Sequence, residues 1–318
     1  MIGIINKAIV YLVVILLFAA CVSDSTKANK VSVQEKVETK TKANQSQVQE
    51  PEIATFNNAK RYPRKEDWIL DRTYNLTGLD ISGVAAYADS IIFVSDVTQH
   101  FVLKYNTVAG NKEVIVNECD VPYLNLQVAR LLMPIADKDS IFVYRGPGPL
   151  YKFKLDYPLS HPTYFDGSSI KNFTIVDQGN HRLLVSRDDK QSTIGEQGSG
   201  PLEFESPSTL VYLGNSIFVS DTGNKRIQAI DLQGNYERSI TENTMESPTA
   251  MATDNQIIFV LDRSQRKVFL FNIQGELLYA IDKNLDDPRD IYFLRGELFV
   301  SDSNGQVKVF ANNAHYHQ

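Results

Sequence analysis

The chain has few of the sequence features that mark a nucleic-acid-binding protein or a simple enzyme. Its 318 residues include 32 Lys and Arg against 38 Asp and Glu, a net charge of −6, and no basic patch. Nucleic acid is therefore not an expected partner. No serine-nucleophile motif, phosphate-binding glycine loop or paired-carboxylate arrangement is present,. These absences leave recognition as the main functional class.

Long hydrophobic runs are also absent. The apolar run at residues 8–20 follows Lys7 and is too short for a comfortable transmembrane span,. It ends in two small residues before Cys21, which is the build of a secretory signal peptide over residues 1–20,. Residues 17–21 (LFAAC) resemble a bacterial lipobox, in which the cysteine thiol is acylated before cleavage. An uncleaved N-terminal anchor helix is the alternative.

Cys21 is therefore the expected lipidation site, with palmitate-type acyl chains as the membrane anchor. Each buried methylene contributes about 0.8 kcal/mol, so several chains anchor a protein firmly. Val22 follows the cysteine where an inner-membrane retention signal has Asp. This favours the outer membrane, with the protein facing the periplasm or the cell surface. Cys119 then has no disulfide partner and is expected to be a structural residue with an unreactive thiol.

Residues 21–62 change sharply in composition. Lys, Glu, Gln, Thr, Ser and Asn dominate, and the apolar residues are scattered singly. Such a segment cannot bury enough apolar surface to offset the entropy lost on ordering. We interpret it as a flexible tether with a reach on the order of 35 Å. A short helix at residues 34–41 is the structural alternative.

A short strand-like phrase recurs six times in the rest of the chain. Its copies are residues 92–96, 141–145, 173–177, 217–221, 258–262 and 298–302, so their ends are 49, 32, 44, 41 and 40 residues apart. A second alternating run rich in β-branched and aromatic residues follows each copy, and turns such as residues 233–235 introduce a further strand,. Four strands in a forty-residue repeat predict the blades of a β-propeller.

The repeats resemble a known family. Residues 203–207 (EFESP), 217–221, 222–228 (TGNKRIQ) and 231–235 (DLQGN) are similar to a complete NHL repeat, and residues 177–182 (DQGNHR) match its centre. The resemblance spans about residues 66–311 and is weakest at Arg145, where a Gly-Pro-Gly-Pro turn follows. The signature of WD40 blades is missing, since Trp68 is the only tryptophan. The resemblance implies an all-β, six-bladed propeller, which we place at residues 63–312, followed by a disordered tail at 313–318.

Closure of the ring and two irregular blades are further predictions. The last copy runs out after its third strand, and residues 68–74 form a strand-like segment without a blade. We expect this segment to complete the last blade and remove the open edges. The spacing of 32 predicts a truncated third blade, and the spacing of 49 predicts a long inter-strand loop near residues 123–130 in the second.

The recurrent Asp with Arg or Lys five residues later invites a catalytic interpretation. Examples are Asp177 with Arg182, Asp221 with Arg226, and Asp262 with Lys267. An active site needs a group once, whereas blade building needs it repeatedly. We therefore interpret these pairs as turn-capping scaffold.

The resemblance also implies a possible metal, because some NHL-related propellers are lyases or lactonases with zinc or calcium in the central channel. Within the propeller this chain offers only His100, His161 and His181. A catalytic zinc usually has more protein ligands than the two that could share a rim. We therefore expect no catalytic residues, metal or other cofactor.

The ligand-binding face is predicted from the turns after the second strand and from the connections between blades. Its candidate residues are Gln99, His100, Tyr123, Arg145, His181, Lys225, Arg266 and Arg289,. Arg145 stands out because the other copies end in Asp, and breaks in a local rule cluster at functional sites.

Three functions remain open. The first is a non-catalytic, lipid-anchored envelope protein that binds a protein, peptide or glycan. The second is a metal-dependent lyase or hydrolase of the NHL-related type. The third is a structural component of an envelope assembly.

Overall fold

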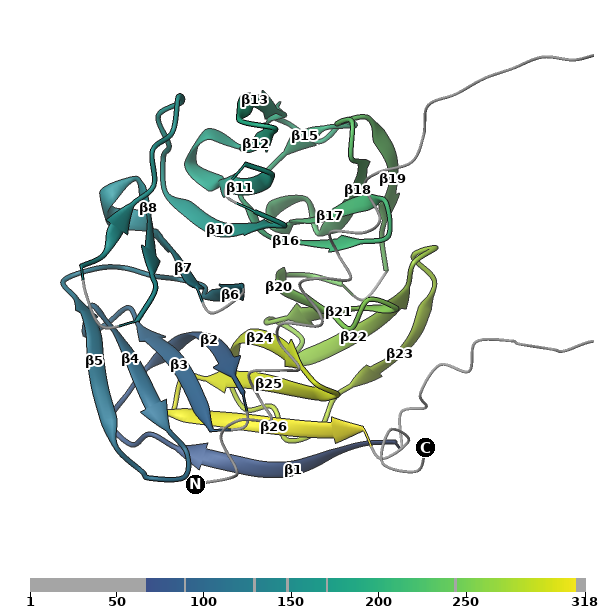
Figure 1. Cartoon of the computed structure of the whole chain (residues 1–318). Coiled ribbons are helices and arrows are strands. Elements are labelled where there is room, and N and C mark those ends of the chain that lie inside the picture. Colours follow the sequence, from purple (N-terminus) through teal and green to yellow (C-terminus); the bar gives the residue numbers. More distant parts are fainter. Residues whose placement is uncertain are drawn as a thin grey trace, which may run out of the picture. The chain divides into compact units, whose positions relative to one another are not determined.

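The described residues fold into six four-stranded antiparallel sheets, seen in the computed structural model of Figure 1. The structure describes residues 67–88, 90–127, 130–146, 149–169, 171–242 and 245–312. The predictions for the signal peptide, Cys21, the tether and the tail lie outside these residues. No helix in this part of the chain is long and apolar enough to span a membrane.

Each sheet is one blade, and its strands follow each other from the inside of the ring to the outside. Blade 1 contains β2 (Ile81–Tyr87), β3 (Ile91–Asp96), β4 (Phe101–Asn106) and β5 (Lys112–Asn117). Blade 2 contains β6 (Asn125–Gln127), β7 (Arg130–Ile135), β8 (Ser140–Tyr144) and β9 (Tyr151–Lys152). Blade 3 contains β10 (Pro162–Gly167), β11 (Phe173–Asp177), β12 (Arg182–Arg187) and β13 (Lys190–Ile194). Blades 4 and 5 contain β16 (Pro207–Leu213), β17 (Ser216–Asp221), β18 (Arg226–Asp231) and β19 (Tyr236–Ile240); and β20 (Pro248–Thr253), β21 (Ile257–Asp262), β22 (Lys267–Asn272) and β23 (Leu277–Ile281). A short parallel pair, β14 (Glu196–Gln197) and β15 (Glu203–Phe204), lies in the connection between blades 3 and 4.

Blade 6 is completed from both ends of the propeller. It contains β24 (Pro288–Leu294), β25 (Glu297–Asp302) and β26 (Gln306–Asn312), with β1 (Trp68–Asn75) as its outermost strand. Strand β1 pairs antiparallel with β26, from Trp68 opposite Asn312 to Asn75 opposite Gln306. Arg72 adds two hydrogen bonds of 2.7 Å to Glu297. The predicted closure strand is therefore confirmed, as is the six-bladed all-β fold.

The ring is held together by packing between neighbouring blades. The inner strands contact each other in cyclic order, including β2 with β24, which joins blade 1 to blade 6. Most hydrophobic clusters span two blades; one of them packs Phe218 of blade 4 against Phe269 and Phe271 of blade 5. A fully buried side chain of this size contributes roughly 1.5–3 kcal/mol. Stability thus comes from the interfaces between blades, without a disulfide in the described residues.

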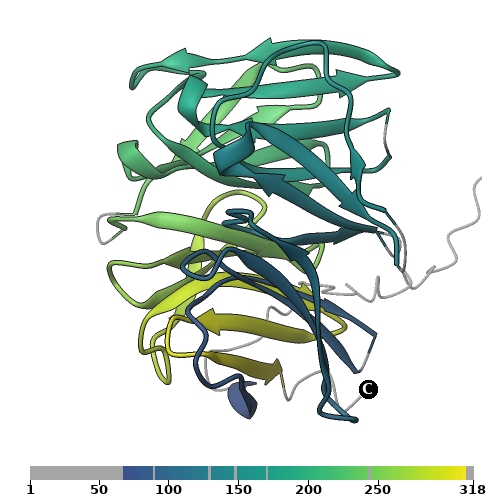
Figure 2. The ribbon, with the colours of Figure 1, turned by 90° about the vertical axis from the view of Figure 1, so that its left-hand side faces the viewer.

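The ring has two faces, which Figure 2 shows edge-on. The turns between second and third strands and the connections between blades lie on one face, which we call the aspartate face. The turns between first and second and between third and fourth strands lie on the other, which we call the opposite face. Figure 1 looks onto the opposite face.

The recurrent aspartates act as scaffold, as predicted. Asp96, Asp177, Asp221, Asp262 and Asp302 end the second strands of five blades and are at most 1% exposed. In each case the carboxylate accepts a backbone N–H from the preceding connection. In blades 3 and 4 it also pairs with the Arg five residues later, at 2.8 and 2.7 Å, whereas the predicted pair of Asp262 with Lys267 is not formed in the described part of blade 5. These bonds join each turn to its neighbouring connection.

Blade 2 corrects the predicted alignment of repeats. Its second strand is β7, so residues 141–145 belong to the third strand and the turn after it. The second strands of the six blades end at residues 96, 135, 177, 221, 262 and 302, which are 39, 42, 44, 41 and 40 residues apart. The predicted truncation of blade 3 is therefore wrong, and the expected long loop near residues 123–130 instead contains the short inner strand β6. Sequence matching failed because Ile135 replaces the terminal Asp.

Candidate functional site

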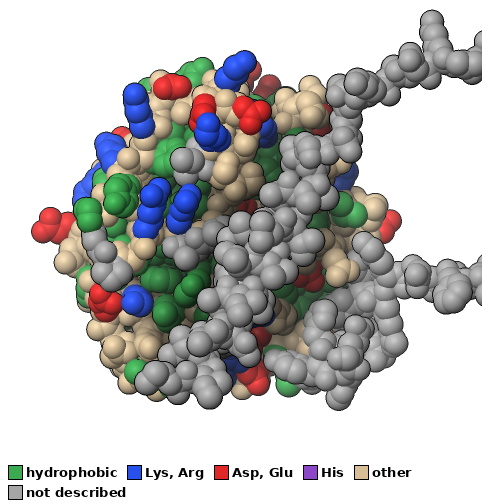
Figure 3. All heavy atoms as spheres, in the orientation of Figure 1, with side chains coloured by type: hydrophobic (Ala, Val, Ile, Leu, Met, Phe, Trp, Pro, Cys, Tyr) green, Lys and Arg blue, Asp and Glu red, His purple; other side chains and the backbone are tan. Residues whose placement is uncertain are grey.

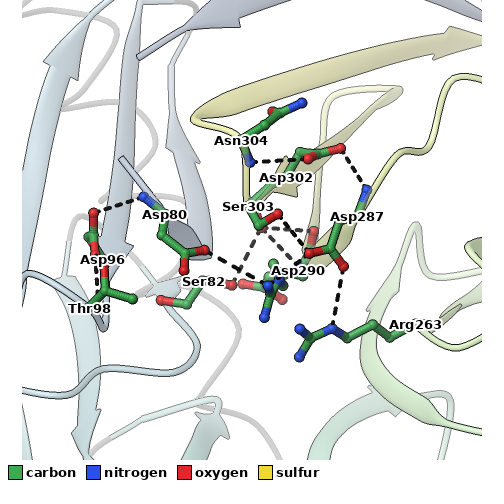
Figure 4. Close-up of polar contacts among 12 residues, drawn as sticks. Asp80, Ser82, Asp96, Thr98, Arg263, Asp287, Asp290, Asp302, Ser303 and Asn304 are labelled. Atoms are coloured by element: carbon green, nitrogen blue, oxygen red, sulfur yellow. Dashed lines mark hydrogen bonds and ion pairs between the residues drawn. The ribbon is translucent and has the colours of Figure 1, made fainter. Parts of the chain in front are cut away.

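Two of the predicted ligand-face residues, Tyr123 and Arg289, lie near each other where the inner strands begin at the aspartate face. Arg263 and Arg289 both reach Asp287, at 3.8 and 2.8 Å, and the amide of Leu124, next to Tyr123, bonds to the carboxylate of Asp290, next to Arg289. Tyr123, Arg263 and Arg289 come from three different blades, because Tyr123 precedes β6, Arg263 follows β21 and Arg289 is the second residue of β24. We call this group, with Asp80 and Asp287, the axial cluster; Figure 4 labels Arg263, Asp80 and Asp287 of it.

Asp287 links the two arginines. Its Oδ2 lies 2.8 Å from Arg289 Nη2 and accepts a 2.7 Å hydrogen bond from Ser303, while Arg263 Nε is 3.8 Å from Oδ1. Burial opposes ionisation of Asp287, but the Ser303 hydrogen bond and the two arginine charges outweigh it and lower its pKa,. Asp287 is therefore ionised at neutral pH, and it leaves the arginines only partly neutralised.

Arg289 retains an unused donor. Its Nη2 is 4.0 Å from Asp80, but its Nε is buried and has no hydrogen-bond partner in the described part of the chain. A buried donor without a partner costs free energy that an incoming acceptor can recover. The side chains around it remain accessible, since Arg263, Asp287 and Asp80 are 42, 43 and 37% exposed. The cluster can therefore accept a polar ligand group.

Asp290 lies beneath the axial cluster and holds three blades together. Its carboxylate is 2% exposed and accepts backbone N–H groups from Val84 of blade 1, Leu124 beside blade 2 and Ile291 of its own strand. Desolvation raises its pKa well above the usual range despite these bonds,. Asp290 is thus a structural residue that fixes the relative positions of Tyr123 and Arg289.

Four other predicted residues share one structural position. His100, His181, Lys225 and Arg266 each close the turn after a second strand in the left-handed region, with φ between 52° and 58°. Gln99 precedes His100 in the same turn and donates hydrogen bonds to Asp96 and to the Gly78 carbonyl. Their position is therefore determined by the turn, and they lie on the rim of the aspartate face.

The two histidines on this rim are not brought together. His100 contacts Asp120, whereas His181 Nδ1 accepts a 3.3 Å hydrogen bond from the Ser206 amide and lies 3.8 Å from Glu205. Over the described ranges, no group of three or more His, Cys, Asp or Glu residues is arranged to hold a metal ion.

Arg145 is placed differently from the prediction. It follows β8, the third strand of blade 2, and therefore lies on the opposite face. Its guanidinium stacks over the Tyr151 ring at 5.0 Å. The prediction placed it with the other candidates because residues 141–145 had been aligned with second strands.

Arg263, Asp80 and Asp287 were not among the residues predicted for the site. A signal for Arg263 was present, because the first residue of this turn is uncharged in the other five blades and Arg only in blade 5. The two aspartates had no comparable signal, since acidic residues are common in the connections.

The other end of the inner strands carries a second polar group. Asp166 of β10 accepts hydrogen bonds from the Gly167 amide at 2.7 Å and from Gln127 of blade 2. Burial raises the pKa of Asp166 to about 6 although these bonds favour the ionised form,. Tyr292 lies close enough for this carboxylate to contribute, after burial, to raising the tyrosine pKa to about 12.

The fold defines the chain as a six-bladed β-propeller, and comparisons with solved structures agree. A gluconolactonase from Xanthomonas campestris matches with a TM-score of 0.62 and 14% identity over 75% of this chain and 89% of that one. Virginiamycin B lyase from Staphylococcus aureus matches with a TM-score of 0.57 and 14% identity over 77% and 88%. The WD40 propeller domain of Doa1 matches with a TM-score of 0.59 and 14% identity over 77% and 97%.

These likenesses show the fold alone. The neighbours include enzymes as well as a propeller domain without a named activity. No protein-family model matches the chain, and no curated protein sequence matches it.

Proposed function

We propose that the protein is a lipid-anchored binding protein of the bacterial cell envelope, with an NHL-type propeller that binds a charged peptide or glycan at the axial cluster. The observation that carries the binding site is the unpartnered, buried Arg289 Nε beside the accessible Arg263 guanidinium. The anchor rests on the lipobox-like residues before Cys21.

The chemistry of the axial cluster favours a ligand with both ionised and hydroxyl groups. Two guanidiniums provide charge-assisted donors, and Asp80 and Asp287 provide acceptors,. The Tyr123 ring packs edge to face on Tyr164, with the centroids 6.4 Å apart, and against core side chains of neighbouring blades, so it supports the cluster from the core. A purely apolar ligand would leave the charged groups unpaired and is disfavoured.

Soluble muropeptides test the site, because they combine sugar rings with charged peptides. We expect calorimetric binding by the full chain, and a loss of at least about tenfold in Arg289→Ala, equivalent to about 1.4 kcal/mol. Arg263→Ala is expected to lose several-fold. Arg266→Ala is the matched control, since this arginine lies three residues from Arg263 on the exposed rim and is expected to change affinity by less than about twofold.

Two results would contradict the site. One is the absence of binding by the wild-type chain; the other is an equal loss in Arg266→Ala and Arg289→Ala, which would indicate nonspecific attraction to the rim.

The anchor is tested separately by labelling cells with radioactive palmitate. We expect label in the membrane-bound wild-type chain and none in Cys21→Ser. Label retained in the variant would refute lipidation at this cysteine.

A further inference from the structure

A pocket on the opposite face lies between blades 1 and 2, far in the fold from the axial cluster. Its volume is about 170 Å³, and its lining includes Tyr87, Phe93, Leu131, Tyr144, Lys104 and Arg145. Phe93 and Tyr144 also pack edge to face in the core shared by these blades, with their ring centroids 6.4 Å apart. The base of the pocket is therefore part of a rigid blade interface.

Blade 2, which forms one side of the pocket, has short inner and outer strands. Its inner strand β6 has three residues and its outer strand β9 has two. The corresponding strands of blade 4, β16 and β19, have seven and five. Apolar side chains of blades 1 and 2 line the hollow at this end of their interface. Figure 3 looks onto this face and shows hydrophobic side chains gathered beside Lys and Arg over the blades at its left.

Two cations stand at the rim of this apolar pocket. Lys104 Nζ is 3.3 Å from Glu113, so its charge is partly neutralised. Arg145 stacks on Tyr151, and no carboxylate of the described residues pairs with it. Stacking holds the guanidinium in place while leaving its N–H groups free to donate. The rim therefore offers a preorganised site for an anion next to apolar walls.

We propose that this pocket binds a small carboxylate that carries an aromatic or branched aliphatic group. The apolar group fits the hollow, whose volume suits a single ring, and the carboxylate meets the Arg145 guanidinium with Lys104 beside it,. A neutral ligand would gain the apolar contacts and lose the charged ones. This site does not depend on the axial cluster.

Saturation-transfer NMR with phenylacetate and the full chain tests the proposal, with protein-free buffer and detergent as the blank. A ligand of this size is expected to bind with a Kd on the order of 0.1–1 mM. We expect phenylacetamide, the neutral analogue, to bind the wild-type chain about tenfold more weakly. Phenylacetate should bind the Arg145→Gln variant about tenfold more weakly than the wild-type chain. Tyr87→Ala removes a wall of the pocket and is expected to weaken binding several-fold.

Lys152→Gln is the matched control, because Lys152 is exposed on β9 next to Tyr151 and does not line the pocket. Arg145 and Tyr87 are both exposed, so their variants should keep the wild-type melting temperature,.

Three results would overturn the proposal: equal binding of phenylacetate and phenylacetamide, equal binding of phenylacetate by Arg145→Gln and Lys152→Gln, or no binding of phenylacetate. Binding of only a peptide with a C-terminal Phe would also overturn it. Arg289→Ala should leave phenylacetate binding unchanged, which separates this site from the proposed function.

Discussion

Blade 4 and blade 2 occupy equivalent places in the ring but are stabilised in different ways. In blade 4 the buried Asp221 accepts hydrogen bonds from the Glu205 amide, Asn224, Arg226 and Gln228. In blade 2 the same position is Ile135, which is 2% exposed and packs in the core shared with blade 1.

In blade 2 another residue of the turn makes the hydrogen bond to the preceding connection that Asp221 makes in blade 4. The exposed Asp137, two residues after Ile135, accepts a 3.0 Å hydrogen bond from the Asp120 amide in the preceding connection. The turn and the connection are thus joined in both blades, but by a buried polar network in one and by a surface contact beside a buried apolar side chain in the other. A blade therefore needs the link and does not need the buried aspartate.

Placing the recurrent aspartate into blade 2 should have the largest effect on this comparison. In Ile135→Asp the blade loses a buried side chain and gains a carboxylate in an apolar core, so we expect the free energy of unfolding to fall by about 5 kcal/mol. Urea denaturation of the full chain measures the change. Ile135→Val is the control and should cost about 1 kcal/mol. A loss below about 2 kcal/mol for Ile135→Asp would mean that the six blades are interchangeable at this position.

Removing the buried aspartate from blade 4 should be nearly as harmful. Asp221→Ala leaves the Arg226 guanidinium without its carboxylate partner and removes the acceptor of the Glu205 backbone amide, and we expect a loss of about 3–4 kcal/mol,. Asp137→Ala in blade 2 is the matched variant, because its side chain is exposed, and should cost about 1 kcal/mol or less,. Equal losses in the two variants, again measured in urea, would refute the difference between the blades.

Asp166 connects blade 3 to the short inner strand of blade 2 and should make stability depend on pH. Its folded pKa of about 6 lies above the usual value of 3.8, so the folded state binds more protons between these values,. Its contribution to stability is complete below about pH 4 and is lost as the pH rises through 6. Asp166→Asn imitates the protonated form, so the wild-type chain should lose about 2–3 kcal/mol relative to this variant between pH 4 and pH 7.

Urea denaturation of both chains at several pH values measures this difference. A constant difference across the range, or one that grows in favour of the wild-type chain as the pH rises, would contradict the burial of this carboxylate.

The sequence was sufficient for the repeating parts of the fold and insufficient for the irregular ones. Blades that end their second strand in Asp could be counted, and the unpaired strand at Trp68 required a partner that the last blade provided. Blade 2 was misaligned because residues 131–135 lack the Asp while residues 141–145 imitate the phrase.

The candidate site was less predictable than the fold. Tyr123 and Arg289 could be proposed from their connections, but Arg263 reaches Arg289 only through Asp287, which depends on how blades 5 and 6 are placed in the ring. Arg145 was selected because residues 141–145 were matched to second strands, whereas they belong to the third strand of blade 2 and the turn after it.

The smallest expected effect concerns local opening of blade 2. Cys119 lies in the connection before this blade and is 1% exposed, and burial raises the pKa of its thiol to about 11. At pH 8 a Cys21→Ser chain should therefore react with a thiol reagent at least about a hundredfold more slowly when folded than in urea.

The short strands of blade 2 predict that this residual reaction occurs through local opening, at a rate independent of low urea concentrations. The same probe placed in blade 4, as Val219→Cys with Cys119→Ala, should react only through global unfolding and accelerate with urea, because its strands are longer and Val219 is fully buried. Similar urea dependence at both positions would mean that blade 2 is as stable as the regular blade despite its missing strand length.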